Sequence, residues 1–168
     1  MTYDWDTLVA RLRKYPADYH HFLAPCPQHR IADAGKQLGT MPAILKQMLE
    51  NFNGAELFVD ACGGGAMLSL FGLTTVPPLP PLEWGEDWYI DRFTPHWRAA
   101  GTDRDDDWAI GMENYGGLIL FNESRGISEW GTSERGWLLE NVVFGDWIEK
   151  VIADGETVMA ELNQDKSL

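Results

Sequence analysis

Residues 108–130 decide the fold, because apolar runs alternate with turns along them. This stretch reads WAIGMENYGGLILFNESRGISEW. The runs 108–112, 118–121 and 127–130 are rich in the branched and aromatic residues that favour strands, and short glycine-containing turns separate them. We therefore predict three antiparallel strands joined by hairpins.

The segments on either side of this stretch show mainly helical periodicity. Apolar residues recur at helical spacing in five segments, 5–14, 16–23, 31–38, 40–52 and 143–153. Residues 86–97 can hold a further helix, and the short apolar runs 57–59 and 67–71 favour strands. The sequence thus predicts a single α+β domain, with a mostly antiparallel sheet of about 4–6 strands and helices packed around it.

Capping residues suggest where these helices begin and end. Asp4 is expected to cap the first helix, Pro16 to open the second and Gly39 to end the third. Thr40 is expected to cap the fourth helix, and Gly155 to end the last one.

The charge of the chain excludes one large class of function. It carries 26 Asp and Glu against 13 Lys and Arg, a formal net charge of −13. Nucleic-acid binders gain affinity from basic side chains that displace counterions, so we expect no nucleic-acid partner. No apolar run approaches the roughly 20 residues that span a membrane, and the first residues lack a basic secretory signal. We therefore expect a cytoplasmic protein in which Cys26 and Cys62 are reduced.

Acidic and aromatic residues are concentrated in the second half. Residues 1–84 carry 8 acidic and 6 basic side chains, whereas residues 85–168 carry 18 and 7. Seven of the eight tryptophans lie beyond residue 83. An acidic surface there would attract a basic protein, although such a run can also be only a solvated loop. The expected partner-binding residues are five carboxylates and two tryptophans: Asp103, Asp105, Asp106, Asp107, Glu113, Trp84 and Trp88. The alternative for the two tryptophans is packing in the core.

Signals for catalysis, metals and cofactors are weak. His21, Cys26 and His29 lack a fourth zinc ligand, and the aspartate run lacks the glycine and closing glutamate of a calcium loop. The glycines at 63–65 lack the residues that accompany a phosphate-binding loop. We expect no catalytic residue, metal or cofactor, although two carboxylates brought together by folding remain open as an acid–base pair.

Several short motifs, in their order and spacing, resemble those of the SUKH superfamily, which includes the yeast cell-wall assembly regulator. The similar stretches are Leu38-Gly39-Thr40-Met41-Pro42, Asn53-Gly54 after a helix, Trp108-Ala109-Ile110-Gly111, Gly116-Gly117-Leu118-Ile119-Leu120 and Phe144-Gly145-Asp146-Trp147-Ile148. The scaffold positions that we carry over from this resemblance are Leu38, Gly39, Pro42, Asn53, Gly54, Trp108, Gly111 and Gly117.

The resemblance implies a compact α+β domain over residues 31–155, with an N-terminal helical extension over 1–30 and a C-terminal tail over 156–168. For bacterial members it implies immunity proteins that bind and neutralise toxins, often nucleases, and it carries no shared catalytic residues. The leading hypothesis is therefore a non-enzymatic protein-binding module whose acidic, tryptophan-rich face neutralises a basic toxin. The alternatives are a regulatory or scaffold protein of the same superfamily and a carboxylate-dependent hydrolase.

Overall fold

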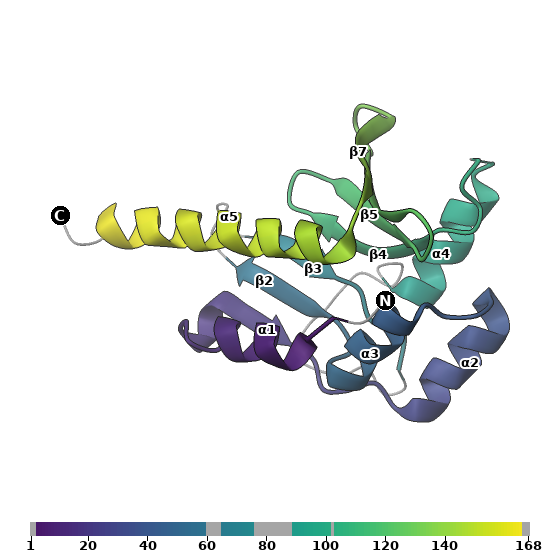
Figure 1. Cartoon of the computed structure of the whole chain (residues 1–168), viewed down its shortest axis with the longest axis horizontal. Helices are drawn as coiled ribbons and strands as arrows, with labels where there is room; N and C mark the ends of the chain where they lie inside the picture. The colour runs from purple at the N-terminus through teal and green to yellow at the C-terminus, as the bar shows by residue number, and fades with distance from the viewer. Residues whose placement is uncertain (1–2, 60–64, 76–88, 102, 166–168) are drawn as a thin grey trace.

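A seven-stranded antiparallel sheet forms the centre of the molecule, and its strands follow one another in chain order (Figure 1). The computed structural model describes residues 3–59, 65–75, 89–101 and 103–165. The strands are β1 (His20–Phe22), β2 (Ala55–Val59), β3 (Ala66–Leu70), β4 (Trp108–Glu113), β5 (Gly117–Asn122), β6 (Gly126–Gly131) and β7 (Gly136–Val142). The helices are α1 (Trp5–Leu12), α2 (Gln28–Leu38), α3 (Ala43–Asn51), α4 (Ile90–Ala99) and α5 (Phe144–Asp165), with one 3-10 turn at Ala17–Tyr19. The predicted α+β class and single antiparallel sheet are confirmed, with slightly more strands than expected.

The predicted meander is β4, β5 and β6. Trp108 pairs with Phe121, and Phe121 pairs in turn with Ile127, so the three strands lie side by side. Every residue of β5 is buried. The alternation of β-forming runs and turns was therefore sufficient to place these strands.

Strands β1 and β7 were not predicted. The prediction of a helix opened by Pro16 is wrong, because only Ala17–Tyr19 is helical and His20 then pairs with Leu57. Strand β7 follows a tight turn in which Arg135 takes a φ of 53°, and its pairing with β6 is interrupted by irregularities. Both strands form edges of the sheet, where fewer neighbours impose a regular hydrophobic alternation.

The predicted start of the first helix and end of the third are confirmed. The side chain of Asp4 accepts a hydrogen bond from the Thr7 amide at 2.9 Å, and Gly39 follows the end of α2 with a φ of 98°. The expected cap at Thr40 is wrong, because α3 begins at Ala43 directly after Pro42, and no side chain caps it. The fixed backbone of Pro42 sets this start instead.

Helix α5 continues well beyond its expected end and projects past the strands (Figure 1). Gly155 lies inside this helix, where a Cβ atom would come within 2.4 Å of the Phe58 ring. The residue therefore permits close packing and does not end the helix. Residues 156–165 continue α5 where a separate tail was expected.

Aromatic side chains from both ends of the chain meet in one core. The ring of Trp5 lies 5.4 Å from that of Phe52 and 5.5 Å from that of Phe144, and Phe144 also contacts Phe121 of β5. On the surface, Arg11 of α1 donates to Glu149 of α5 at 2.8 Å. The first helix is thus part of the same core as the residues expected to form the domain.

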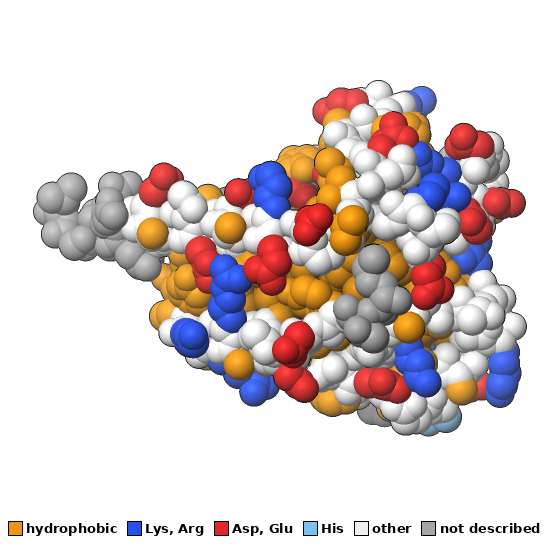
Figure 2. All heavy atoms as spheres, viewed as in Figure 1, with side chains coloured by type: hydrophobic (Ala, Val, Ile, Leu, Met, Phe, Trp, Pro, Cys, Tyr) orange, Lys and Arg blue, Asp and Glu red, His pale blue; other side chains and the backbone are white. Residues whose placement is uncertain are grey.

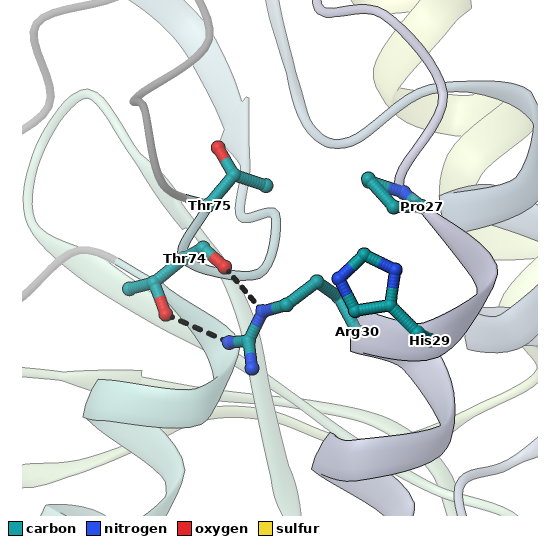
Figure 3. A pocket seen from close by; sticks show the side chains of 5 residues that line it. All are labelled: Pro27, His29, Arg30, Thr74 and Thr75. Carbon is teal, nitrogen blue, oxygen red and sulfur yellow. Dashed lines mark hydrogen bonds between the residues drawn. The ribbon is translucent and has the colours of Figure 1, made fainter.

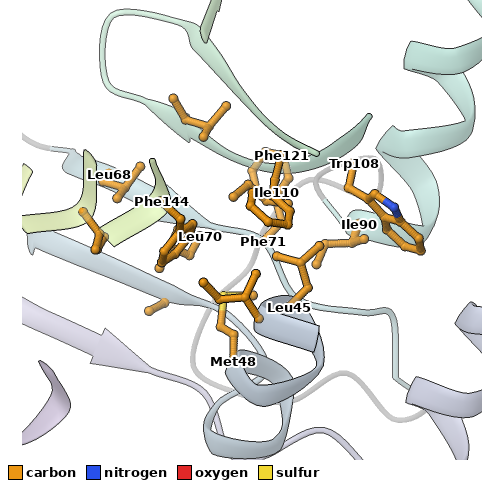
Figure 4. Packing of buried hydrophobic residues seen from close by; sticks show 14 of the residues in the cluster. Leu45, Met48, Leu68, Leu70, Phe71, Ile90, Trp108, Ile110, Phe121 and Phe144 are labelled. Carbon is orange, nitrogen blue, oxygen red and sulfur yellow. The ribbon is translucent and has the colours of Figure 1, made fainter. Parts of the chain in front are cut away.

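Helix α3 packs under the sheet with the side chains that its periodicity predicts. Figure 4 shows Leu45 and Met48 pointing toward Leu70 and Phe71, all of them buried. Trp108, one of the scaffold positions carried over from the resemblance, is buried beside Ile90 of α4, and the Arg98 guanidinium lies 5.0 Å from its ring centroid.

The carried-over scaffold positions have identifiable structural roles. Asn53 is buried, and its side-chain amide donates to the Leu73 carbonyl and accepts from the Leu73 amide, both at 2.8 Å. Gly54 takes a φ of 102°, which favours glycine. At Gly111, a Cβ atom would lie 2.5 Å from the Ser69 carbonyl oxygen of the neighbouring strand.

Among the described residues, no helix is long and apolar enough to cross a membrane.

Candidate partner-binding surface

The aspartate run lies in the loop between α4 and β4, and its five residues face in different directions. Asp103, Asp105 and Asp106 are exposed. Arg104 and Asp107 are only 9% and 1% exposed. The loop therefore presents three carboxylates to solvent and turns its single cation and its last carboxylate inward.

Arg104 fastens this loop to the sheet. Its guanidinium donates to the Ser128 hydroxyl at 2.7 Å, pairs with Glu140 of β7 and lies 3.8 Å from the centroid of the Trp137 ring. In addition, the Trp97 indole N–H donates to the Arg104 carbonyl at 3.1 Å. A buried arginine with hydrogen bonds and an aromatic face holds a loop more rigidly than the loop's own backbone would.

Arg125, from the turn between β5 and β6, neutralises the end of the run. It pairs with Asp106 and with Asp107, the latter at 2.5 Å, and Asn122 donates to Asp106 at 2.8 Å. The hydrogen bond from Arg125 lowers the pKa of Asp106, and the one from Asn122 acts in the same direction. Asp107 is therefore an internal ion-pair partner that is inaccessible to another protein, while Asp106 is exposed but already paired.

Asp103 and Asp105 are the most available carboxylates of the loop. Neither forms a hydrogen bond or an ion pair with the residues that the structure describes. The charge of Arg98 interacts with Asp105, but its guanidinium donates to the carbonyls of Leu38 and Asp107. These two aspartates can therefore accept hydrogen bonds from a basic partner without losing internal ones.

The loop is flanked by two tryptophans that were not among the residues expected to bind a partner. Trp130 and Trp137 are half-buried, their rings are 5.1 Å apart, and each also contacts Trp97 of α4. The expected anchors, Trp84 and Trp88, lie outside the described residues. We use the name acidic loop surface for the following set: Asp103, Asp105, Asp106, Trp130, Trp137 and Glu140.

Glu113 does not belong to the acidic loop surface. Glu113 is the last residue of β4, five residues after Trp108. Because an extended strand rises about 3.3 Å per residue, roughly 17 Å of strand separates Glu113 from Trp108, the residue that follows the aspartate loop. Acidic side chains are also not confined to the loop. On the face shown in Figure 2 they are spread over several elements and interleaved with Lys and Arg.

A cavity of about 340 Å³ lies between α2 and the chain after β3. It is lined by Pro27, His29, Arg30, Thr74 and Thr75 (Figure 3). The Arg30 guanidinium donates to the Thr74 carbonyl at 2.8 Å, to the Thr74 hydroxyl at 3.0 Å and to Asp91 at 3.1 Å. These bonds connect α2 to α4, so we assign Arg30 a structural role.

The residues considered for zinc are not arranged as ligands. Cys26 is a buried free thiol whose pKa burial raises to about 11, while the His21 imidazole lies 3.4 Å from Glu56. Within the described ranges, no group of three or more His, Cys, Asp or Glu side chains is placed to hold a metal ion.

No protein-family model matches the chain, and no curated protein matches it as a relative. The SUKH resemblance therefore remains a prediction from the residues alone.

Proposed function

We propose that this protein is an immunity-type binding module, which neutralises a basic toxin domain by docking to it and performs no chemistry of its own. The observation that carries the proposal is the acidic loop surface, a fixed loop with exposed aspartates beside half-buried tryptophans. The resemblance to the SUKH superfamily and the net charge of −13 support it independently.

Charge accelerates the encounter in this mechanism. The negative potential of the chain attracts a basic domain, and such steering raises association rates more than it raises final affinity. Asp103 and Asp105 then pair with lysine or arginine side chains that a nuclease toxin would use to hold phosphate. Covering those side chains stops the toxin without any reaction.

Rigidity makes the docking efficient. A flexible acidic loop would lose conformational entropy on binding, whereas Arg104 already holds this loop against Ser128 and Trp137. Trp130 and Trp137 add apolar area at the edge of the charged loop, and tryptophan is among the residues that contribute most to protein interfaces. Asp107 stays bonded to Arg125 throughout and supports the loop from within.

The experiment begins with affinity capture of the basic partner from the source organism. Association rates of the purified partner are then measured at several salt concentrations for the wild type and for the variant Asp103→Asn, Asp105→Asn, Asp106→Asn. We expect the variant to associate about tenfold or more slowly at low salt and to show a flatter salt dependence.

A control variant removes the same charge elsewhere: Asp6→Asn, Asp18→Asn, Glu161→Gln, all exposed positions. Equal slowing in both variants would show that only net charge matters and would discard the assigned surface. A captured partner that keeps full activity in the complex would contradict neutralisation and favour the regulatory or scaffold alternative.

A further inference from the structure

A second acidic cluster includes the end of β4 opposite to the aspartate loop. Glu113 ends β4, Tyr115 lies in the turn that follows, and Glu129 comes from β6. Strand β5 separates the two glutamates, but it begins with Gly117, which has no side chain. A Cβ atom at Gly117 would lie 1.9 Å from Glu129 Oε1 and 3.0 Å from the Tyr115 ring. The carboxylate of Glu129 thus occupies the space beside Gly117 and approaches Tyr115.

One carboxylate oxygen of this cluster lacks a hydrogen-bond donor in the part of the chain that the structure describes. Glu129 is only 5% exposed, and its Oε1 has no hydrogen-bond partner among the described residues. The Tyr115 hydroxyl carries a single proton, so it can donate to only one acceptor at a time. A buried carboxylate oxygen without a donor is costly unless a cation or another proton joins it.

The titration of the cluster agrees with this shortage. Burial raises the pKa of Glu113, and the nearby charge of Glu129 raises it further. Burial also raises the pKa of Tyr115, as do its interactions with the two glutamates. Lys150 of α5 is close enough to lower the pKa of Glu113, but its ammonium pairs with Asp154. Lys150 is thus already engaged in an ion pair.

A cavity of about 310 Å³ opens beside the cluster. Its lining is Met67, Glu113, Asn114, Tyr115 and Val158. The Tyr115 side chain is 63% exposed, so its ring forms an accessible wall, and Met67 and Val158 supply apolar surface. A carboxylate beside apolar side chains in one cavity suits a ligand with an alkyl stem and a cationic tip.

We infer that this cavity binds a primary alkylammonium group, with Glu113 as the direct contact and Glu129 as the charge behind it. An ammonium has three N–H donors and no acceptor, so it suits a site that presents carboxylate oxygens. Its alkyl stem lies against Met67, Val158 and the Tyr115 ring. The occupant is a lysine side chain of the basic partner. That identity rests on the proposed function, whereas the ammonium chemistry does not.

The test uses n-butylammonium chloride as the probe and NMR of the full-length labelled protein as the readout. We expect saturable shifts of the Glu113 carboxyl carbon and the Tyr115 ring, together with a fall in the apparent pKa of Glu113 as the amine binds. Sodium chloride at equal ionic strength should produce neither effect. Shifts that match those in sodium chloride would overturn the inference.

Variants separate this site from general charge effects. Glu113→Gln should weaken butylammonium binding about tenfold or more, because it removes the directly bonded charge. Glu129→Gln should weaken it less, and Glu161→Gln should leave it unchanged. Because Glu129 is buried, the amide spectrum first establishes that its variant is folded. Equal binding by wild type and Glu113→Gln would refute the assignment.

The acidic loop variant distinguishes this inference from the proposed function. Asp103→Asn, Asp105→Asn, Asp106→Asn should bind butylammonium as the wild type does, since the loop lies at the other end of β4. If the wild type does not bind butylammonium, the ammonium site is refuted, whereas the proposed docking through the acidic loop surface is unaffected. Butylammonium binding together with a captured basic partner that binds Glu113→Gln as tightly as the wild type would leave the site intact but remove the partner's lysine as its occupant.

Discussion

Replacing Gly155 by alanine tests the packing between α5 and β2. The new Cβ would lie 2.4 Å from two carbon atoms of the Phe58 ring and 2.6 Å from a third. Phe58 is fully buried and takes a φ of 54°, so its ring has little freedom to withdraw. Relieving such an overlap typically costs about 1–3 kcal/mol, while alanine favours a helix over glycine by about 1 kcal/mol. We therefore expect the free energy of unfolding to fall by up to about 2 kcal/mol.

Gly35 provides a matched control for this substitution. It lies in the interior of α2, and a Cβ atom there would meet nothing within 4 Å. Gly35→Ala should therefore raise the free energy of unfolding by up to about 1 kcal/mol. Urea unfolding followed by circular dichroism measures both variants under the same conditions. If Gly155→Ala stabilises the protein as much as Gly35→Ala does, the contact between α5 and Phe58 does not exist as described.

Two further substitutions test the loop anchor and a buried histidine. Arg104→Met removes the hydrogen bond to Ser128 and the contact with Trp137, so we expect urea unfolding to show a loss of about 2–4 kcal/mol. The exposed control Arg92→Met should change it by less than about 0.5 kcal/mol, and equal effects would contradict the anchor. His20 is 9% exposed, its Nδ1 accepts from the Phe58 amide at 3.2 Å, and burial, followed by the charge of His21, lowers its pKa to about 4. Because the unfolded chain takes up this proton near pH 6.5, stability should fall by up to about 3 kcal/mol as the pH drops from 6.5 to 4. His20→Asn should remove that part of the pH dependence in urea titrations, and an unchanged slope would show that another group causes it.

The sequence predicted the parts of the fold that local patterns determine. The strands around Phe121 followed from runs of β-forming residues between short turns, and the end of α2 followed from Gly39. Strand β1 has three residues, HHF, and its identity depends on pairing with Leu57, which is distant in the chain. Glycine commonly follows the last residue of a helix, so the sequence around Gly155 predicts a helix end. Only the close approach of the Phe58 ring shows why glycine stands inside the helix instead.

The candidate surface was predictable in charge but not in pairing. The density of aspartates before β4 is visible in the sequence, and so is the single arginine within the run. Nothing local shows that Arg125 reaches Asp107, or that Arg104 turns inward onto Trp137, because both contacts span the sheet. Trp130 and Trp137 were detectable as tryptophans on adjacent apolar segments, but selecting them required knowing that β6 and β7 are paired.

The chain order of the strands has a consequence for how the molecule is made. Each strand pairs with the one that precedes it, so during synthesis every new strand meets a template that has already emerged. Helix α5 arrives last and returns to the first helix, where Arg11 meets Glu149. We therefore expect nascent chains that end before α5 to form the sheet but to leave Trp5 and Phe52 exposed to solvent and to chaperones. Packing of α5 then buries these side chains.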